Sequence, residues 1–195
     1  MPGPSHPVLH TVDRPRTPGR LSTMVRPRGH GHLADDMAAL RDAGADIVVC
    51  ALPDAERVEL GLADEPRLAE AAGLRFVALP VPDFTVPSIP VVLPLLRELA
   101  GELRTGAHVV VHCRCAIGRS SLIAVSLMLL EGMTSEAAWA AMARARRARV
   151  PDTEEQHAWT LEFFRAVAPV ARNRGTDPPD RPSPTDSPPP PAQPA

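Results

Sequence analysis

The 195-residue chain contains no lysine and no tyrosine, and aromatic residues make up only 3% of it. All of its positive charge is therefore arginine, and together with 24 prolines and many alanines this composition suggests a GC-rich bacterial genome. The net charge of −2 is close to neutral, so neither nucleic acid nor a membrane surface is an expected partner. The length predicts one domain with two tails.

Cysteine and long apolar runs are also scarce. The three cysteines, Cys50, Cys113 and Cys115, are odd in number and lack the spacing of a disulfide framework, which favours a reducing compartment. The N-terminal residues lack the apolar core of a signal peptide. The longest apolar stretch, Leu122 to Leu130, is too short to span a bilayer. These features together predict a cytoplasmic protein.

The two ends of the chain differ in composition from its middle. Residues 1–18 carry five prolines and few apolar side chains, so we expect a flexible arm there. Residues 173–195 are mostly Pro, Asp, Ser and Thr, which predicts a disordered tail with polyproline II character and an unknown partner. The folded catalytic domain is expected over residues 19–172.

Short apolar runs alternate with longer helical patterns between these tails. The runs, taken as strands, are Leu21–Arg26, Asp46–Leu52, Arg75–Leu79 and His108–His112. The helical segments are Leu33–Ala43, Asp64–Ala72, Ser88–Arg104, Ile117–Glu131, Ser135–Arg149 and Thr153–Val167. Runs without polar alternation indicate strands buried on both faces. The pattern predicts an α/β fold, a central and mainly parallel sheet of four or five strands with helices on both faces. Its ligand site should lie beyond the carboxyl ends of the strands.

The strongest functional signal is the segment that follows the last of these strands. Cys113 ends the apolar run, and Arg119 stands at the start of an apolar helix. A tight loop between them can turn several backbone N–H groups inward as an anion nest, to which the start of the helix adds its own free N–H groups. The residues expected to bind phosphate are Arg114, Cys115, Ala116, Ile117, Gly118 and Arg119.

The residue types in this loop suit covalent catalysis. The inward amides and the guanidinium of Arg119 favour a thiolate at Cys113, which is an activated nucleophile. Arg119 can also hold two phosphate oxygens at once. The hydroxyl of Ser120 can hydrogen-bond the sulfur and ease its departure from a phosphocysteine. Gly118 is expected to give the backbone freedom where the loop turns sharply.

The His-Cys-x5-Arg-Ser spacing of residues 112–120 resembles the signature of the protein tyrosine phosphatase superfamily. The chain is similar to its dual-specificity branch, and within that branch to the kinase-associated phosphatase and its bacterial relatives, over roughly residues 19–170. The resemblance implies hydrolysis of phosphomonoesters through a phosphocysteine at Cys113, without a metal or other cofactor, and with His112 in a supporting position. One departure is that the family often has Ala and Gly where this chain has Cys115 and Ala116. The loop accommodates the change if Ala116 does not need a positive φ angle.

The same resemblance implies a general acid and a second loop beside the phosphate. Asp83, between prolines in the loop after the strand Arg75–Leu79, stands where the family has its acid; by itself it would be an ordinary turn residue. Asp152 replaces a Gln that positions the hydrolytic water in tyrosine-specific members. Thr153 and Gln156 match that second loop as well, but they also form a capping box for the last helix. We favour the cap, with Asp152 free to face the site.

The expected substrate is a phosphorylated protein or peptide, with phosphotyrosine, phosphoserine and phosphothreonine all open. Lipid-specific relatives commonly carry extra lysines in the loop, whereas here only Arg114 adds charge. The absence of tyrosine removes the aromatic wall with which tyrosine-specific members deepen the pocket, so we expect a shallow pocket. Two other functions stay open, a catalytically silent phosphoprotein-binding module and a rhodanese-like sulfurtransferase.

Oxidation is a further expectation from the cysteines. The kinase-associated phosphatase has a cysteine in a strand similar to the one that ends with Cys50. The resemblance therefore implies a Cys113–Cys50 disulfide after attack by peroxide on Cys113. The alternative is that Cys50 is a small buried hydrophobe, which is the commonest role of a free cysteine.

Overall fold

The computed structural model describes residues 7–14 and 17–167 and contains one five-stranded sheet. Its strands are β1 (His10–Thr11), β2 (Arg20–Val25), β3 (Ile47–Cys50), β4 (Arg75–Ala78) and β5 (His108–Cys113). They lie in the order β1-β2-β5-β3-β4. All neighbouring pairs are parallel except β1 and β2. The predicted α/β fold with a mainly parallel sheet is confirmed.

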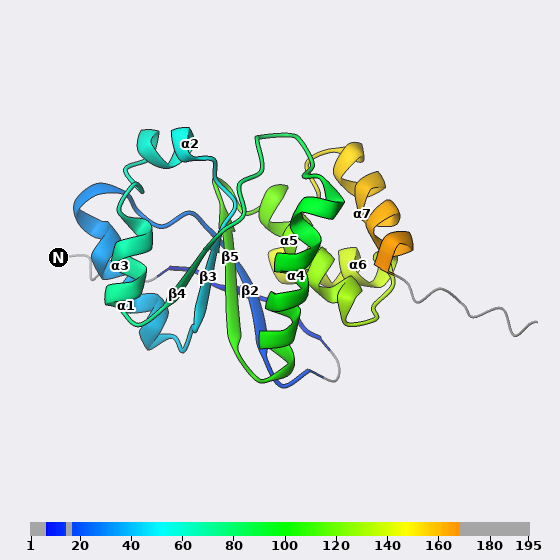
Figure 1. Ribbon diagram of the computed structural model, residues 1–195, viewed down its shortest axis with the longest axis horizontal. Helices are drawn as coiled ribbons and strands as arrows, with labels where there is room; N and C mark the ends of the chain where they lie inside the picture. The colour runs from blue at the N-terminus through cyan, green and yellow to red at the C-terminus, as the bar shows by residue number, and fades with distance from the viewer. Residues whose placement is uncertain (1–6, 15–16, 168–195) are drawn as a thin grey trace, which may run out of the picture.

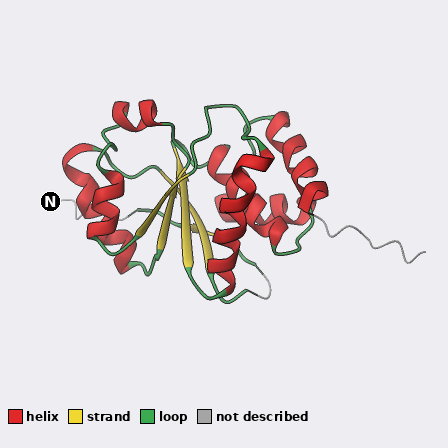
Figure 2. Ribbon diagram, viewed as in Figure 1, coloured by secondary structure: helices red, strands yellow, loops and turns green. Residues whose placement is uncertain are grey.

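Helices cover both faces of this sheet (Figures 1 and 2). They are α1 (Leu33–Asp42), α2 (Asp54–Glu59), α3 (Glu65–Ala71), α4 (Ile89–Arg104), α5 (Arg119–Leu130), α6 (Ser135–Arg146) and α7 (Glu154–Val167). Helices α1 and α3 pack on one face, and α4 to α7 gather on the other. None of the helices in the described part of the chain is long and apolar enough to cross a membrane.

The two central strands and α5 form the middle of the core. Every residue of β3 and β5 is buried, as expected for strands covered on both faces. Helix α5 is buried from its first residue almost to its last, because it packs against α4, α6 and α7 as well as β2 and β5. A helix that is apolar on all sides is stable only in such surroundings. The strand that ends at Cys113 and the helix that begins at Arg119 are therefore held rigidly.

Several predicted bounds shift by a few residues, and three elements were not predicted: strand β1, the 3₁₀ helix His30–His32 and helix α2. Helix α5 begins at Arg119 instead of residue 117, because the residues before it belong to the loop. Helix α4 begins at Ile89 and contains Pro94 in its interior. Helix α2 was missed because its six residues include no buried side chain, so no apolar period marks it.

The N-terminal segment also differs from the prediction of a flexible arm over residues 1–18. His10 and Thr11 pair with β2, and Val12 is buried. The side chain of Arg14 is buried as well, and its Nη1 lies 2.5 Å from Oε2 of Glu131 at the end of α5. The prediction is therefore wrong for residues 7–14, which belong to the folded domain. The predicted tail, 173–195, lies outside the described residues.

The carboxyl ends of β2, β5, β3 and β4 meet at one edge of the sheet. Helix α2, the loop after β4 and the start of α7 lie at this same end, at the top of Figure 1. Segments that are far apart in the sequence thus converge on the loop after β5, where the sequence places its chemistry.

Candidate active site

The loop between β5 and α5 wraps around the sulfur of Cys113. This side chain is buried, with 2% exposure for the residue. The backbone N–H of Ala116 donates to the sulfur over 3.2 Å, and the hydroxyl oxygen of Ser120 lies 3.3 Å from it. These two polar contacts fix the position of the sulfur within the loop. The sequence prediction that Ser120 contacts the sulfur thus agrees with the geometry.

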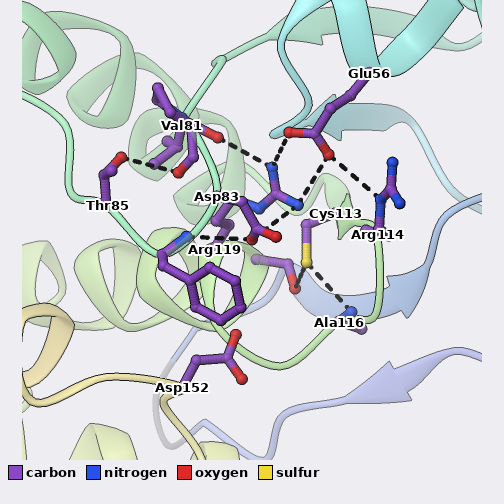
Figure 3. A network of polar contacts seen from close by, with 12 residues as sticks. Glu56, Val81, Asp83, Thr85, Cys113, Arg114, Ala116, Arg119 and Asp152 are labelled. Carbon is purple, nitrogen blue, oxygen red and sulfur yellow. Dashed lines mark hydrogen bonds and ion pairs between the residues drawn. The ribbon is translucent and has the colours of Figure 1, made fainter. Parts of the chain in front are cut away.

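Arg119 is fixed beside this sulfur by a carboxylate that sequence reasoning did not identify. Its Nη1 and Nη2 donate to the two carboxylate oxygens of Glu56, over 2.7 and 3.2 Å, and Nη1 also donates to the carbonyl of Val81 over 3.2 Å. Figure 3 shows the guanidinium between Glu56 and Asp83, with Cys113 close by. Burial lowers the pKa of Arg119, but Glu56 and the nearby Cys113 and Asp83 raise it above its ordinary value.

Glu56 also connects to the second arginine of the loop. Its Oε2 lies 3.5 Å from Nε of Arg114, and Nη2 of Arg114 lies 2.8 Å from Oε1 of Glu59. The side chain of Arg114, which the sequence assigned to phosphate binding, is thus paired with α2. The signal in the sequence was two glutamates three residues apart, which share a helix face, after a buried strand.

Asp83 lies across the pocket from this loop, as the sequence predicted for the acid. Its Oδ1 is 3.2 Å from Nη2 of Arg119 and accepts the backbone N–H of Phe84 over 3.2 Å. The carboxyl side chain is 45% exposed, so it can reach a ligand that enters from solvent.

One cavity of about 130 Å³ joins these groups. It is lined by Asp83, Phe84, Cys113, Arg114, Cys115, Ile117, Gly118, Arg119 and Asp152. The expectation of a pocket without an aromatic wall is wrong, because Phe84 stands in its lining. Phe84 is 61% exposed and has a φ of 57°, a left-handed conformation that the sequence did not reveal.

Two residues of the loop have backbone roles that differ from the prediction. Ala116 has a φ of 59°, so the condition under which Ala could replace Gly without strain is not met. Gly118 has φ −84° and needs no special freedom. This position needs glycine because there is no room for a side chain. A Cβ here would collide with the carboxylate of Asp152 and lie 2.9 Å from the amide of Gln156.

The residues before α7 fill that space and close the cavity. Gln156 N–H donates to Oγ1 of Thr153 over 3.1 Å, and Asp152 N–H donates to Oε1 of Gln156 over 3.2 Å. Thr153 therefore caps the helix, as favoured from the sequence, whereas the side chain of Gln156 binds the backbone of Asp152 and does not complete the capping box; Asp152 faces the cavity. Burial raises the pKa of Asp152, as does the charge of Asp83, against the opposing effect of a hydrogen bond from Gly118 and the charge of Arg119.

His112 and Cys50 belong to a separate buried group. Nε2 of His112 lies 2.7 Å from Oε1 of Glu65, and both side chains have no exposure. Cys50 stands opposite His112 in the strand register, and one donor atom from each of these three residues lies within 4.8 Å of the others. A direct hydrogen bond already joins the imidazole and the carboxylate, so we interpret the group as an ion pair with a neighbouring thiol. All three cysteines are free thiols.

Comparisons with known proteins give a family and a fold. The family model described as "Polymorphic toxin system, DSP-PTPase phosphatase" matches residues 22–133, which is more than half of the chain. A comparison with curated proteins gives no match.

Solved structures share the fold over most of the chain. The kinase associated phosphatase, with its catalytic-site cysteine replaced by serine, is 18% identical with a TM-score of 0.77, covering 85% of this chain and 98% of that one. Tk-PTP in its active form is 27% identical with a TM-score of 0.60, covering 80% and 97%. PTPMT1 in complex with PI(5)P is 17% identical with a TM-score of 0.62, covering 74% and 91%.

The left-handed backbone of Ala116 gives a prediction on stability. Ala116→Gly should raise the free energy of unfolding by roughly 0.5–1 kcal/mol, because relief of the left-handed strain exceeds the entropy that Gly adds to the unfolded chain. Urea unfolding of the two proteins measures the difference. Ala124→Gly, the same change inside α5, should instead lose about 1 kcal/mol or more. A loss of stability in Ala116→Gly as large as in this control would contradict the assignment of strain.

Proposed function

Because the chain belongs to the DSP-PTPase phosphatase family of polymorphic toxin systems, we propose that it hydrolyses phosphorylated proteins through a phosphocysteine at Cys113. The family makes the chain a cysteine-based phosphatase; the nucleophile, the acid and the class of substrate are the parts proposed. The observation that supports them is that Cys113, Arg119 and Asp83 line one cavity of about 130 Å³.

The first chemical step uses these three groups together. A phosphate dianion would be held by the guanidinium of Arg119 and by the N–H groups of the loop. The thiolate of Cys113 attacks phosphorus, and the bond from phosphorus to the substrate oxygen breaks. Asp83, which contacts Arg119 at 3.2 Å, is placed to give its proton to that departing oxygen. Glu56 keeps the guanidinium plane in position throughout, because it holds both terminal nitrogens.

The second step returns the enzyme to its first state. Water attacks the phosphocysteine, a carboxylate accepts its proton, and the sulfur departs as a thiolate next to the hydroxyl of Ser120. Asp83 has just lost a proton and is the candidate for this base. Asp152 lines the same cavity, but its pKa is raised by burial and by the charge of Asp83. It is therefore ionised less readily than an ordinary aspartate. We assign Asp152 to the positioning of the water.

The charges around the loop support a phosphoprotein in preference to a phosphoinositide. A lipid headgroup with several phosphates needs cations beyond the one that holds the reacting phosphate. The second arginine of the loop itself, Arg114, is paired with Glu56 and Glu59. One structure similar in fold was solved with PI(5)P, yet its 17% identity carries only the fold. Phe84 in the cavity lining offers an aromatic contact to a phosphorylated side chain.

The two rival functions fit these observations less well. A silent binding module does not need an acid beside the leaving oxygen, whereas Asp83 lies in the cavity with the thiol. A sulfurtransferase of the rhodanese type does not use such an acid either. The nucleophile must be a reduced thiol, which supports a reducing compartment such as the cytoplasm.

The role of Cys50 as a redox partner stays a prediction. It stands opposite His112 in the register, one residue before Cys113, and its thiol is buried with His112 and Glu65. Peptide mapping of peroxide-treated protein, before and after reduction, would show whether the Cys113–Cys50 disulfide forms.

The nucleophile is tested by a pair of matched variants. Cys113→Ser should reduce turnover of a small aryl phosphate by roughly 10³-fold or more, because a serine hydroxyl lacks the nucleophilicity of a thiolate. Binding of inorganic phosphate, measured by calorimetry, should remain, since the backbone and Arg119 are intact. Cys115→Ser makes the same atomic change on an exposed side chain and should keep most of the activity. Appreciable turnover by Cys113→Ser would remove Cys113 from the mechanism.

The acid is tested by comparing leaving groups. Asp83→Asn should lower kcat by roughly 10²–10⁴-fold for a phosphopeptide, whose leaving oxygen needs a proton. The loss should be much smaller for an aryl phosphate with an activated leaving group. Equal losses on the two substrates would show that Asp83 has only a structural role.

The class of substrate is tested by direct competition. Turnover of phosphopeptides should exceed turnover of phosphoinositides in detergent micelles, because Arg114, the second arginine of the loop, is already paired with Glu56 and Glu59. Faster hydrolysis of the phosphoinositide would overturn this part of the proposal.

A further inference from the structure

One peptide unit of the loop between β5 and α5 forms hydrogen bonds on both of its sides. Its inner side is the backbone N–H of Ala116, which donates to the sulfur of Cys113 over 3.2 Å (Figure 3). Its outer side is the carbonyl of Cys115, which accepts Nη2 of Arg146 over 3.4 Å. The bond between Cys115 and Ala116 is a planar trans peptide, so its carbonyl and its N–H point in opposite directions. A contact that holds the carbonyl outside the loop therefore holds the N–H inside it.

The arginine that makes the outer contact comes from a distant element. Arg146 is the last residue of α6 and lies 31 positions after Cys115 in the sequence. Its Nε and Nη1 are buried and have no hydrogen-bond partner within the described part of the chain. Burial lowers the pKa of Arg146 below its ordinary value, and the charge of Cys113 opposes this effect without cancelling it. Among the described residues, the guanidinium is thus directed at the loop and not at a carboxylate.

The backbone of the loop works against the observed orientation of this peptide. Ala116 has a φ of 59°, a left-handed conformation that is disfavoured for alanine. Rotation of the peptide plane by about half a turn would leave the path of the chain nearly unchanged and return this φ angle to negative values. The same rotation would turn the N–H away from the sulfur and direct the carbonyl oxygen into the loop. The negative end of the peptide dipole would then face the sulfur and the bound phosphate, where it is unfavourable.

We propose that Arg146 is a positioning residue for the reaction at Cys113: it holds the Cys115 carbonyl outside the loop and so keeps the Ala116 N–H directed at the sulfur and at the phosphate. Arg146 is not among the residues that line the catalytic cavity, so it acts through the peptide and not by contact with the substrate. This inference rests on the proposed function of Cys113.

The first test removes the outer contact. Arg146→Met keeps an unbranched apolar stem and removes all donors. It should lower both kcat/KM for an aryl phosphate and the affinity for inorganic phosphate, measured by calorimetry, by about tenfold or more, the effect of one hydrogen bond with a charged partner. Arg146→Lys keeps a cationic donor and should retain more of both. Arg144→Met makes the same change on an exposed side chain of α6 and should leave both unchanged. Phosphate affinity that is unchanged in Arg146→Met would overturn the proposal.

The second test is a double-mutant cycle with Ala116→Gly, which separates the orientation of the peptide from a general effect on charge or folding. Glycine adopts a positive φ without strain, so the peptide needs less support from outside the loop. The loss of kcat/KM caused by Arg146→Met should therefore be smaller in the Ala116→Gly protein than in the parent, by at least about threefold. Equal losses in the two backgrounds would show that Arg146 does not act through this peptide.

The cycle also covers a variant that does not fold. If Arg146→Met is unfolded in urea-free buffer, the same cycle is measured with Arg146→Lys. The expected losses are then smaller, but the loss should again be reduced by Ala116→Gly, and equal losses would again contradict the proposal.

The outcomes distinguish this inference from the proposed function. If Cys113→Ser kept its turnover, the proposed function would fail, whatever the behaviour of the Arg146 variants. If Cys113→Ser is inactive and Arg146→Met binds phosphate as the parent does, the inference on Arg146 fails and the proposed function stands.

Discussion

The bidentate ion pair between Glu56 and Arg119 is the contact on which the candidate site depends. A phosphate loop needs a guanidinium whose plane faces the anion, and a long arginine side chain has many other conformations. The carboxylate of Glu56 accepts hydrogen bonds from both terminal nitrogens of Arg119, and the carbonyl of Val81 accepts a second one from Nη1. The first contact comes from α2 and the second from the loop after β4. Arg119 therefore links α2 and the loop after β4 to the start of α5. These three segments are thus held in a fixed arrangement around the site.

The same edge of the sheet collects further constraints around this pair. The left-handed Ala116 turns its N–H toward the sulfur of Cys113, and Gly118 leaves room for Asp152 and Gln156. On the opposite face of β5, Oε1 of Glu65 lies 2.7 Å from Nε2 of the buried His112. The site thus holds strain and buried charge in a short stretch of chain, and the rigid packing of β5 and α5 keeps that stretch in place.

The sequence predicts the parts of this site that are local. Cys113, Arg119 and Ser120 lie within eight consecutive residues between a buried strand and an apolar helix, so spacing alone predicts the loop. Asp83 needed the family resemblance, because a single Asp in a proline-rich loop has no pattern of its own. The sheet was predictable because its central strands are continuous apolar runs.

The contacts between distant segments could not be predicted in the same way. Glu56 and Glu65 contact residues that are 63 and 47 positions away. Glu56 belongs to α2, a short helix that shows no apolar period, and nothing in the sequence around Glu65 indicates its partner. Strand β1 has only two residues, too few for any alternation. The positive φ angles of Phe84 and Ala116 arise from loop geometry, since neither residue type favours that conformation.

The most direct measurement of the central claim is the isolation of the covalent intermediate. The protein is mixed with a small aryl phosphate, quenched in acid within one turnover and digested for mass spectrometry. The account predicts a phosphoryl group on the sulfur of Cys113, at a level that rises and falls with turnover. Phosphate on a different residue, or continued turnover with Cys113 never modified, would contradict it.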